Sequence, residues 1–572
     1  MKTLFRRPTF AVTTRFVLLL AGFTSLNTEA AGVWTPLANP APGGVELMLL
    51  LPDGTIMAAN EPGGTTFSAD WYLLTPDNHG SYVNGAWSFL SSMNDTRYDY
   101  ASAVLTNGQV WVAGGEYGTG YATSEVYDPL ANNWNTISIP LTLLDPSQNS
   151  PEIGGKQGFV DAISKILPNG KILVAPVGAK NIGGTLIFDP ATASFANGPT
   201  FFKTGYPDQA EASWVKLPDD SFLTVDPVGT NSERFIPALN KWIVDANTPM
   251  NLYTNGEIGP ALLLPNGKAF FFGASGHTAI YTPSGNTNLG TWIAGPDIPN
   301  HLISPDAPAA MMSNGKILCA VEPLPVYSAP TTFYEYDWVA NAFTAVGGPT
   351  GPTYYAAPYY TKMLDLPDGR VLFSTGGNAQ LYVYTPDGSL LAAGKPIIAT
   401  ITLNTNDGSY HLTGTLLNGL SEGATYGDDA QMDSNYPLVR LTDVANNVYY
   451  ARTYNWNSTS VRATNRLVST EFVLPDGLPP ANYSLVAVAN GIASDPVALQ
   501  LPLQLQIAPL ANANAVILTW PVIPANSALE KSANLTSAVW TTVTNLPALA
   551  GNNFVLTNST VGSAAFFRLH LH

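Results

Sequence analysis

The stretch YYTKMLDLPDGRVLFSTGG, residues 359–377, decides the fold, because two apolar runs flank an Asp-Gly turn. Asp-Gly or Asn-Gly between apolar runs is the strongest short-range signal of a β-hairpin, since these residues tolerate the backbone angles of a tight turn. Six looser copies precede this one. Aligned on the turn, the seven units are VELMLLLPDG, DYASAVLTNG, DAISKILPNG, EASWVKLPDD, IGPALLLPNG, DAPAAMMSNG and YTKMLDLPDG.

Further strand patterns complete each unit. A second apolar run follows the turn, and a third usually ends in an aromatic residue and a proline. A fourth carries an aromatic residue, and the seven are Trp34, Trp87, Trp134, Phe195, Trp242, Trp292 and Phe343. The turns are 47 to 62 residues apart. Four-stranded repeats of this size indicate a β-propeller, and we predict seven blades.

The order of the strands predicts how the ring closes. Trp34 precedes the first hairpin, and no aromatic fourth strand follows the seventh unit. We therefore expect the N-terminal strand around Trp34 to complete the blade formed by residues 363–386, which removes two open sheet edges.

The repeat ends after Pro386, so the propeller should cover residues 32–392. Residues 396–501 contain alternating strand patterns between turns, which is typical of an immunoglobulin-like sandwich. Residues 503–572 hold another small set of strands, which we predict to be a fibronectin-like β module. The expected fold class is all-β throughout.

The first 31 residues have the order of a secretory signal peptide. Basic residues precede a short apolar run at 16–23, and small residues follow near Ala30. That run is too short to span a bilayer, so we expect a secreted or cell-surface protein without a transmembrane segment. The net charge of −17 argues against nucleic acid as a partner. The single cysteine, Cys319, excludes an internal disulfide.

The doublets Gly114-Gly115 and Gly376-Gly377, with the Tyr and Trp residues beyond the hairpins, resemble kelch repeats. A signal peptide, a kelch-type propeller and an immunoglobulin-like domain directly behind it together resemble the galactose oxidase and glyoxal oxidase family, over about residues 32 to 500. The resemblance implies a copper ion at one propeller mouth, held by two Tyr and two His. One Tyr of that family is cross-linked to a Cys and stores an oxidising equivalent as a radical.

The matching positions of this chain differ from that pattern. The Tyr-His pair becomes Tyr359-Tyr360, and the cross-linked Tyr falls on Asp99. Residues 43–54 contain no Cys, and the second His falls near Asn455-Trp456. Imidazole and thiolate ligands that hold copper are missing, so we do not expect copper or a retained copper-radical site. The six histidines (79, 277, 301, 411, 570 and 572) show no metal-binding spacing.

Four units begin with an acid nine residues before the turn, and these are Asp99, Asp161, Glu211 and Asp306. This register predicts a position at the start of the innermost strand, at the mouth of the axial channel. A ring of carboxylates there is a candidate binding site and a candidate Ca²⁺ site. The alternative is that these acids are solvated or cap nearby backbone N–H groups.

The stretch GPTYYAAPYYTK, residues 351–362, places Tyr354, Tyr355, Tyr359 and Tyr360 before the seventh inner strand. Their aromatic faces could stack on sugar rings. The alternative is packing against the immunoglobulin-like domain.

A second candidate Ca²⁺ site lies in the loop SEGATYGDDAQMDSNYPLVRL, residues 421–441. It concentrates Glu422, Asp428, Asp429 and Asp433. A solvated loop, or ion pairs with Arg440 or Arg452, is the alternative.

Two hypotheses about function remain, since no other catalytic motif is present. The first is a non-catalytic binding or adhesion module whose partner is a glycan or an extracellular protein. The second is an oxidoreductase of the galactose oxidase type with a metal site rebuilt from Tyr359, Tyr360 and the ring acids. The sequence favours the first, because the ligands that are missing are the catalytic ones and the residues that are kept are scaffold.

Overall fold

The computed structural model describes residues 32–63, 66–144, 159–160, 162–176, 184–202, 209, 212–255, 258–404, 406–427, 430–479, 481–501, 505–511, 514–521, 527–536, 539–550, 553–560 and 565–571. The predicted signal peptide lies outside these ranges, and so do four candidate site residues: Asp161, Glu211, Asp428 and Asp429.

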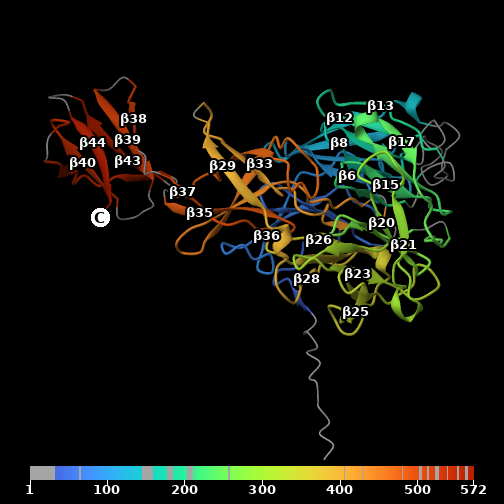
Figure 1. Cartoon of the computed structure of the whole chain (residues 1–572). Coiled ribbons are helices and arrows are strands. Elements are labelled where there is room, and N and C mark those ends of the chain that lie inside the picture. The colour runs from blue at the N-terminus through green and yellow to red at the C-terminus, as the bar shows by residue number, and fades with distance from the viewer. Residues whose placement is uncertain are drawn as a thin grey trace, which may run out of the picture. The chain divides into compact units, whose positions relative to one another are not determined.

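Seven antiparallel sheets of four propeller strands follow one another along the described part of the first 390 residues (Figure 1). The first blade comprises β2 (Val45–Leu50), β3 (Ile56–Asn60), β4 (Trp71–Thr75) and β5 (Ala86–Phe89), and the second comprises β6 (Ala101–Val104), β7 (Val110–Ala113), β8 (Thr123–Asp128) and β9 (Asn133–Ser138). The third comprises β10 (Ile163–Ile166), β11 (Ile172–Ala175), β12 (Leu186–Asp189) and β13 (Ser194–Asn197), and the fourth comprises β14 (Trp214–Lys216), β15 (Phe222–Val225), β16 (Ser232–Ile236) and β17 (Lys241–Val244). The fifth comprises β18 (Ala261–Leu263), β19 (Ala269–Phe272), β20 (Thr278–Thr282) and β21 (Thr291–Ala294), and the sixth comprises β22 (Ala309–Met311), β23 (Ile317–Val321), β24 (Thr332–Asp337) and β25 (Ala342–Val346). The seventh comprises β26 (Thr361–Asp365), β27 (Val371–Thr375), β28 (Tyr382–Thr385) and β1 (Val33–Pro36). The predicted seven-bladed propeller is confirmed.

The turn residues explain why each inner hairpin forms. Six of the seven turns place their glycine in the left-handed region, with φ between 76° and 88°. Side chains rarely adopt these angles, whereas glycine does so without a steric penalty. The fourth turn has Asp220 at this position with φ of 68°, which Asp tolerates better than most residues.

The ring closes through the N-terminal strand, as the sequence predicts. β1 pairs antiparallel with β28, with Trp34 opposite Tyr384. The Trp34 ring lies 5.0 Å from the ring of Phe333, 5.4 Å from that of Phe373 and 4.8 Å from that of Tyr384, measured between centroids. Its Nε1 donates a hydrogen bond of 2.6 Å to the carbonyl oxygen of Gly347. The seam is thus held by both backbone and aromatic contacts.

The second domain is built from β29 (Ile397–Leu403), β30 (Tyr410–Thr415), β32 (Leu438–Thr442), β33 (Val448–Tyr454), β34 (Val468–Val473), β35 (Asn482–Ala489), β36 (Ile492–Ala493) and β37 (Val497–Gln500). The strands pair in the order β29-β30-β34-β33-β32-β35-β36, and β37 adds to β35. Leu412, Val439, Leu441, Phe472 and Leu485 form the centre of its core. The immunoglobulin-like assignment stays a prediction.

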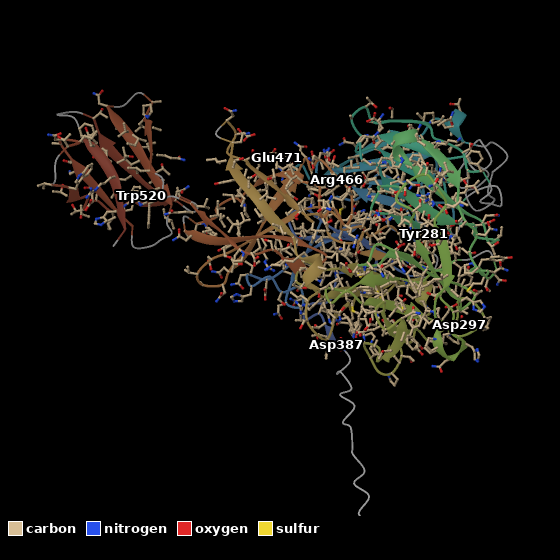
Figure 2. The ribbon with its side chains drawn as sticks, in the orientation of Figure 1. Tyr281, Asp297, Asp387, Arg466, Glu471 and Trp520 are labelled. Carbon is tan, nitrogen blue, oxygen red and sulfur yellow. The ribbon has the colours of Figure 1, made fainter. Side chains whose placement is uncertain are left out.

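The C-terminal module has its own small core. Its strands are β38 (Gln506–Pro509), β39 (Ala515–Pro521), β40 (Ser527–Ser532), β41 (Thr541–Thr542), β42 (Ala548–Ala550), β43 (Asn553–Ser559) and β44 (Phe566–Leu571). They form two sheets, β38-β39-β43-β42 and β41-β40-β44. Leu518, Trp520, Leu529 and Leu556 are buried together (Trp520 is labelled in Figure 2). Its fibronectin-like type stays a prediction.

Helical structure in the described residues is limited to single 3₁₀ turns: η1 (Leu141–Leu143), η3 (Pro237–Leu239), η4 (Pro299–His301), η5 (Pro358–Tyr360) and η6 (Ala392–Gly394). Within the described ranges, no helix has the length and apolar character needed to cross a membrane.

A segment of the second domain, residues 421–436, contacts the inner strands of the propeller, and we name it the plug. Its short strand β31 (Ala424–Thr425) pairs with β22 of the sixth blade. Its other contacts reach Leu50, Ser102, Ser164, Ser213 and the carbonyl oxygen of Tyr359, on the first, second, third, fourth and seventh blades. Inner strands of so many blades meet only around the propeller axis, so the plug occupies the axial channel.

Candidate functional site

The first, second and seventh blades bring three carboxyl groups and one amine together near one end of the channel. Glu46 lies on β2, Glu61 follows β3, Asp99 precedes β6 and Lys362 lies on β26. Glu46, Glu61 and Lys362 are buried, whereas Asp99 is half-buried. The charges of Asp99 and Lys362 act on both glutamates. We name these four residues the mouth cluster.

Burial makes the carboxyl groups of the mouth cluster weak acids. Burial raises the pKa of Glu46 well above its usual value, and the charge of Asp99 and a hydrogen bond with it add to the effect. Burial also raises the pKa of Glu61 to about 7, although the charge of Lys362 opposes this. Near neutral pH the cluster therefore holds protons that ordinary surface carboxylates would have lost.

Lys362 is turned inward and is not presented to a ligand. Its Nζ donates a hydrogen bond of 3.1 Å to the carbonyl oxygen of Tyr359 and lies 3.8 Å from the ring centroid of Tyr426 in the plug. Its side chain is 2% exposed. The charge of the mouth cluster that solvent can reach is therefore the carboxylate of Asp99.

The Gly376-Gly377 doublet positions the backbone and the side chain of Glu61. The backbone N–H of Gly377 donates to the carbonyl oxygen of Glu61 at 3.2 Å. A Cβ atom on Gly376 would lie 1.9 Å from Oε2 of Glu61. Only glycine leaves room for the carboxyl group at this point, so the doublet that suggested a kelch repeat also shapes the mouth.

Aromatic side chains lie beside the cluster in two groups. In the first, the Phe67 ring lies 5.0 Å from that of Tyr98 and 6.3 Å from that of Tyr117. In the second, the rings of Tyr359 and Tyr360 lie 3.9 Å apart, and Tyr327 lies 5.3 Å from Tyr359. We name the six residues the aromatic arc: Phe67, Tyr98, Tyr117, Tyr327, Tyr359 and Tyr360.

Electrostatic effects join the arc to the mouth cluster. Burial raises the pKa of Tyr98, and the charges of Asp99, Glu46 and Glu61 raise it further, with a contribution from Tyr360. Tyr98 is therefore close to the carboxyl groups and to the second aromatic group. Tyr117 is 55% exposed, Tyr327 42% and Tyr360 40%, so three rings of the arc are accessible to a ligand.

The structure separates the four tyrosines that the sequence groups together. Tyr359 and Tyr360 belong to the aromatic arc, and Tyr355 is exposed. Tyr354 is fully buried and packs 5.3 Å from the Phe373 ring inside the propeller core. Of these two neighbouring side chains, that of Tyr354 lies in the core and that of Tyr355 reaches solvent. Tyr354 is thus a core residue of the propeller.

The acidic ring is described only at Asp99 and Asp306. Both have left-handed backbone angles, with φ of 41° and 37°. Asp306 lies against the plug, where a Cβ atom on Gly427 would be 3.2 Å from its Oδ1. Asp99 is hydrogen-bonded to Glu46 in the mouth cluster, whereas Asp306 lies beside the plug, so the two acids of the shared register have different neighbours.

The two described acids of the second candidate Ca²⁺ site, Glu422 and Asp433, bind lysines. Lys165 Nζ lies 3.0 Å from Glu422 Oε2 and 2.9 Å from Asp433 Oδ1, and Lys216 Nζ lies 3.2 Å from Glu422 Oε1. Although burial opposes its charge, the two lysines lower the pKa of Glu422. Burial and the charge of Glu422 raise the pKa of Asp433 to about 6. The alternative of ion pairing is thus seen with lysines as partners.

Sequence reasoning missed Glu61, Lys362 and the aromatic residues Phe67, Tyr117 and Tyr327. Lys362 carried a signal, since it interrupts the apolar pattern of the seventh inner strand. The others lie in loops of the first, second and sixth blades, and their meeting depends on the closed ring.

The donor atoms of the mouth do not fit the copper site that the sequence resemblance implies. They are carboxyl and phenol oxygens, whereas the implied site also holds copper with two imidazole nitrogens. In the described part of the chain, no group of three or more His, Cys, Asp and Glu side chains is placed to hold a metal. Trp456 is buried and stacks on Tyr436, whereas the segment that reaches Tyr359 is the plug. The prediction of calcium at the ring stays a prediction.

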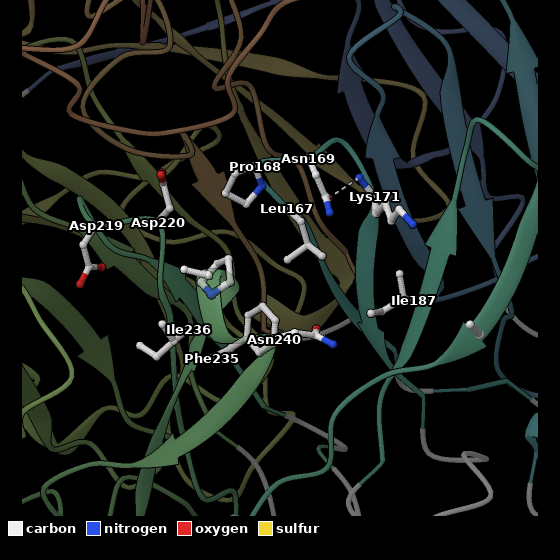
Figure 3. Close-up of a pocket in the computed structure, with 13 residues that line it drawn as sticks. Leu167, Pro168, Asn169, Lys171, Ile187, Asp219, Asp220, Phe235, Ile236 and Asn240 are labelled. Carbon is white, nitrogen blue, oxygen red and sulfur yellow. Dashed lines mark hydrogen bonds between the residues drawn. The ribbon is translucent and has the colours of Figure 1, made fainter.

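A cavity of about 560 Å³ lies elsewhere, between the third and fourth blades (Figure 3). Its lining includes the aliphatic or aromatic side chains of Leu167, Ile187 and Phe235. Its charged groups already have partners, because Lys171 pairs with Asp189 and Asp220 pairs with Arg466 of the second domain (Arg466 is labelled in Figure 2). The mouth, with a half-buried acid and several exposed aromatic rings nearby, is the stronger candidate.

Comparisons with known proteins give structural likenesses only. No protein-family model and no curated protein sequence matches the chain. A fungal alcohol oxidase of the AA5 family, in complex with copper, is 13% identical with a TM-score of 0.48, over 83% of this chain and 100% of its own. YjhT is 14% identical with a TM-score of 0.35, over 55% and 99%. YCF48 from Cyanidioschyzon merolae is 13% identical with a TM-score of 0.39, over 62% and 98%. At these low scores, the propeller rests on the strand pairing of this chain itself.

Proposed function

We propose that this protein is an exported, non-catalytic binding module that holds a glycan at the propeller mouth. One observation carries the proposal: the charge of Asp99 acts on Tyr98 and Tyr359, and the rings of these two tyrosines contact the exposed rings of Tyr117, Tyr327 and Tyr360. Aromatic faces supply flat apolar surface for the faces of sugar rings, and a carboxylate accepts hydrogen bonds from sugar hydroxyls. The two groups of the arc also offer more than one stacking position, which suits an oligosaccharide.

The mouth chemistry supports binding over the alternative of a rebuilt oxidase. A tyrosine radical of the family type works together with a metal ion, and among the described residues no group of three or more His, Cys, Asp and Glu side chains is placed to hold one. The carboxyl groups of Glu46 and Glu61 are largely enclosed and would serve to hold Asp99 and the loops in place.

The test is a glycan array with the mature protein, followed by calorimetry on the glycans that bind. Tyr360→Ala should weaken binding by about tenfold, the equivalent of ~1.4 kcal/mol for one lost stacking contact. Phe89→Ala is the control, because Phe89 is an exposed aromatic residue on the outer strand β5, away from the mouth. Absence of any glycan binding, or equal weakening by both substitutions, would contradict the proposal.

A further inference from the structure

The mouth cluster contains three carboxyl groups but presents a single charge. Glu46 is 4% exposed and Glu61 is 5% exposed, so neither can form a broad contact with a ligand. Lys362 uses its amine on the carbonyl oxygen of Tyr359 and on the Tyr426 ring. An approaching molecule therefore meets the negative charge of Asp99 without a competing positive group from the cluster.

Aromatic rings lie near that charge. Tyr98 is the neighbour of Asp99 in the chain, and its ring lies 5.8 Å from that of Tyr117. The charge of Asp99 also acts on Tyr359, whose ring lies 3.9 Å from that of Tyr360. The faces of aromatic rings carry negative potential and attract cations, most strongly where water is partly excluded. A carboxylate near such rings is the combination that favours a cation over a neutral or anionic group.

The aromatic rings and carboxyl groups that line the mouth favour an organic cation over a metal ion. A metal ion such as Ca²⁺ requires six to eight oxygen ligands, and the carboxyl groups here are not placed as a metal site. Aromatic faces cannot supply such ligands. An organic ammonium needs only one counter-charge, a few acceptors and apolar surface for its carbon skeleton, and the mouth offers all three.

We propose that the mouth recognises a protonated amine, and that its glycan ligand contains amino sugars with free amino groups. This inference rests on the proposed function and names the class of sugar. The ammonium group would lie against Asp99, and the sugar rings would stack on Tyr360 and its neighbours in the arc. Acidic glycans such as uronic acid chains would be excluded by repulsion from Asp99.

The experiment compares three oligosaccharides of equal length by calorimetry: β-1,4-linked glucosamine, its N-acetylated twin and a uronic acid chain. Measurements are made with a chelator present, at a mildly acidic pH where the free amines are protonated. We expect the glucosamine chain to bind about tenfold more tightly than its acetylated twin, and the uronic acid chain not to bind.

Two matched variants assign the preference to Asp99. Asp99→Asn removes the charge and keeps a residue that tolerates the left-handed backbone at φ of 41°. It should reduce the preference for free amines over the acetylated twin to less than about twofold. Asp306→Asn makes the same change at the same register and backbone angle, beside the plug, and should keep the full preference.

The outcomes separate the two proposals. Equal binding of the free and acetylated chains, or a full preference in Asp99→Asn, overturns the amine inference and leaves the glycan proposal standing. Failure of every glycan in both the array and calorimetry overturns both. A circular dichroism spectrum and a melting temperature like those of the wild type confirm that each variant is folded.

Discussion

Removing one charge from the plug should destabilise the whole molecule, and Glu422→Gln is the sharpest way to test this. Gln keeps the size of the side chain but removes its charge. Of the two carboxylates beside Lys165 and Lys216, Glu422 and Asp433, only that of Asp433 then remains. The side chains of both lysines are 3% exposed, and that of Glu422 is 12% exposed. Because both lysines are buried, neither ammonium group can replace the lost carboxylate with hydrogen bonds to water.

The magnitude follows from the contacts. Breaking a buried ion pair by removing one partner costs about 3–5 kcal/mol, because the other charge stays buried. Lys165 still has Asp433 at 2.9 Å, whereas Lys216 keeps the carbonyl oxygen of Thr459 at 3.1 Å and the Phe222 ring at 5.7 Å, without a paired carboxylate. One lysine is thus partly compensated, and we expect a loss of about 3 kcal/mol in the free energy of unfolding.

Urea-induced unfolding followed by tryptophan fluorescence measures this, with Trp456 as a reporter because it stacks on Tyr436 of the plug. A second substitution, Lys216→Met, removes the orphaned amine and should restore at least about 1 kcal/mol in the Glu422→Gln background. The same Lys216→Met change in the wild type should destabilise. A loss below about 1 kcal/mol for Glu422→Gln, or no recovery in the double variant, would refute the argument that burial makes these charges interdependent.

Three more predictions follow from the fold and the site. Trp34→Ala should lower the free energy of unfolding by about 3 kcal/mol, since three ring contacts and a hydrogen bond are lost at the seam; an unchanged urea midpoint would disprove that role. Asp365 is buried, and burial raises its pKa well above its usual value. Its contribution to the stability of the folded state is therefore present at acidic pH, where it is protonated, and is lost as pH rises through the raised pKa. Asp365→Asn should therefore stabilise the protein increasingly from about pH 4 upwards, and melting curves that stay parallel to the wild type across pH would contradict this. With added Cu²⁺, the mature protein should form no hydrogen peroxide from galactose or glyoxal, and peroxide above a metal-free control would favour the oxidase alternative.

The parts of the fold that the sequence predicts are those controlled by local chemistry. Each hairpin is specified by its own turn residues, and the closing strand follows from the order of aromatic positions along the chain. Trp34 could be paired with the seventh blade without coordinates because a four-strand repeat that lacks its last strand leaves one edge to fill.

The site was harder to predict because it depends on distances that the sequence does not contain. Asp99 and Asp306 share a register and a backbone angle, yet they lie in different surroundings because the plug lies against Asp306. Glu61 and Lys362 come from opposite ends of the propeller sequence and meet only after the ring has closed. The burial of Tyr354 beside the exposed Tyr355 is decided by packing against Phe373, which no single stretch of sequence reveals.

The seam between β1 and β28 also sets the order in which the molecule can be completed. Val33 is synthesised early, and its partner Thr385 is added only after all the intervening blades. Until then β1 has no strand beside it, and the unfinished ring offers two open edges that could pair with other chains. The plug comes later still in the sequence. We therefore expect fragments that end before β28 to aggregate, and we expect a new copy to be protected from misassembly only after β28 and the plug have been made.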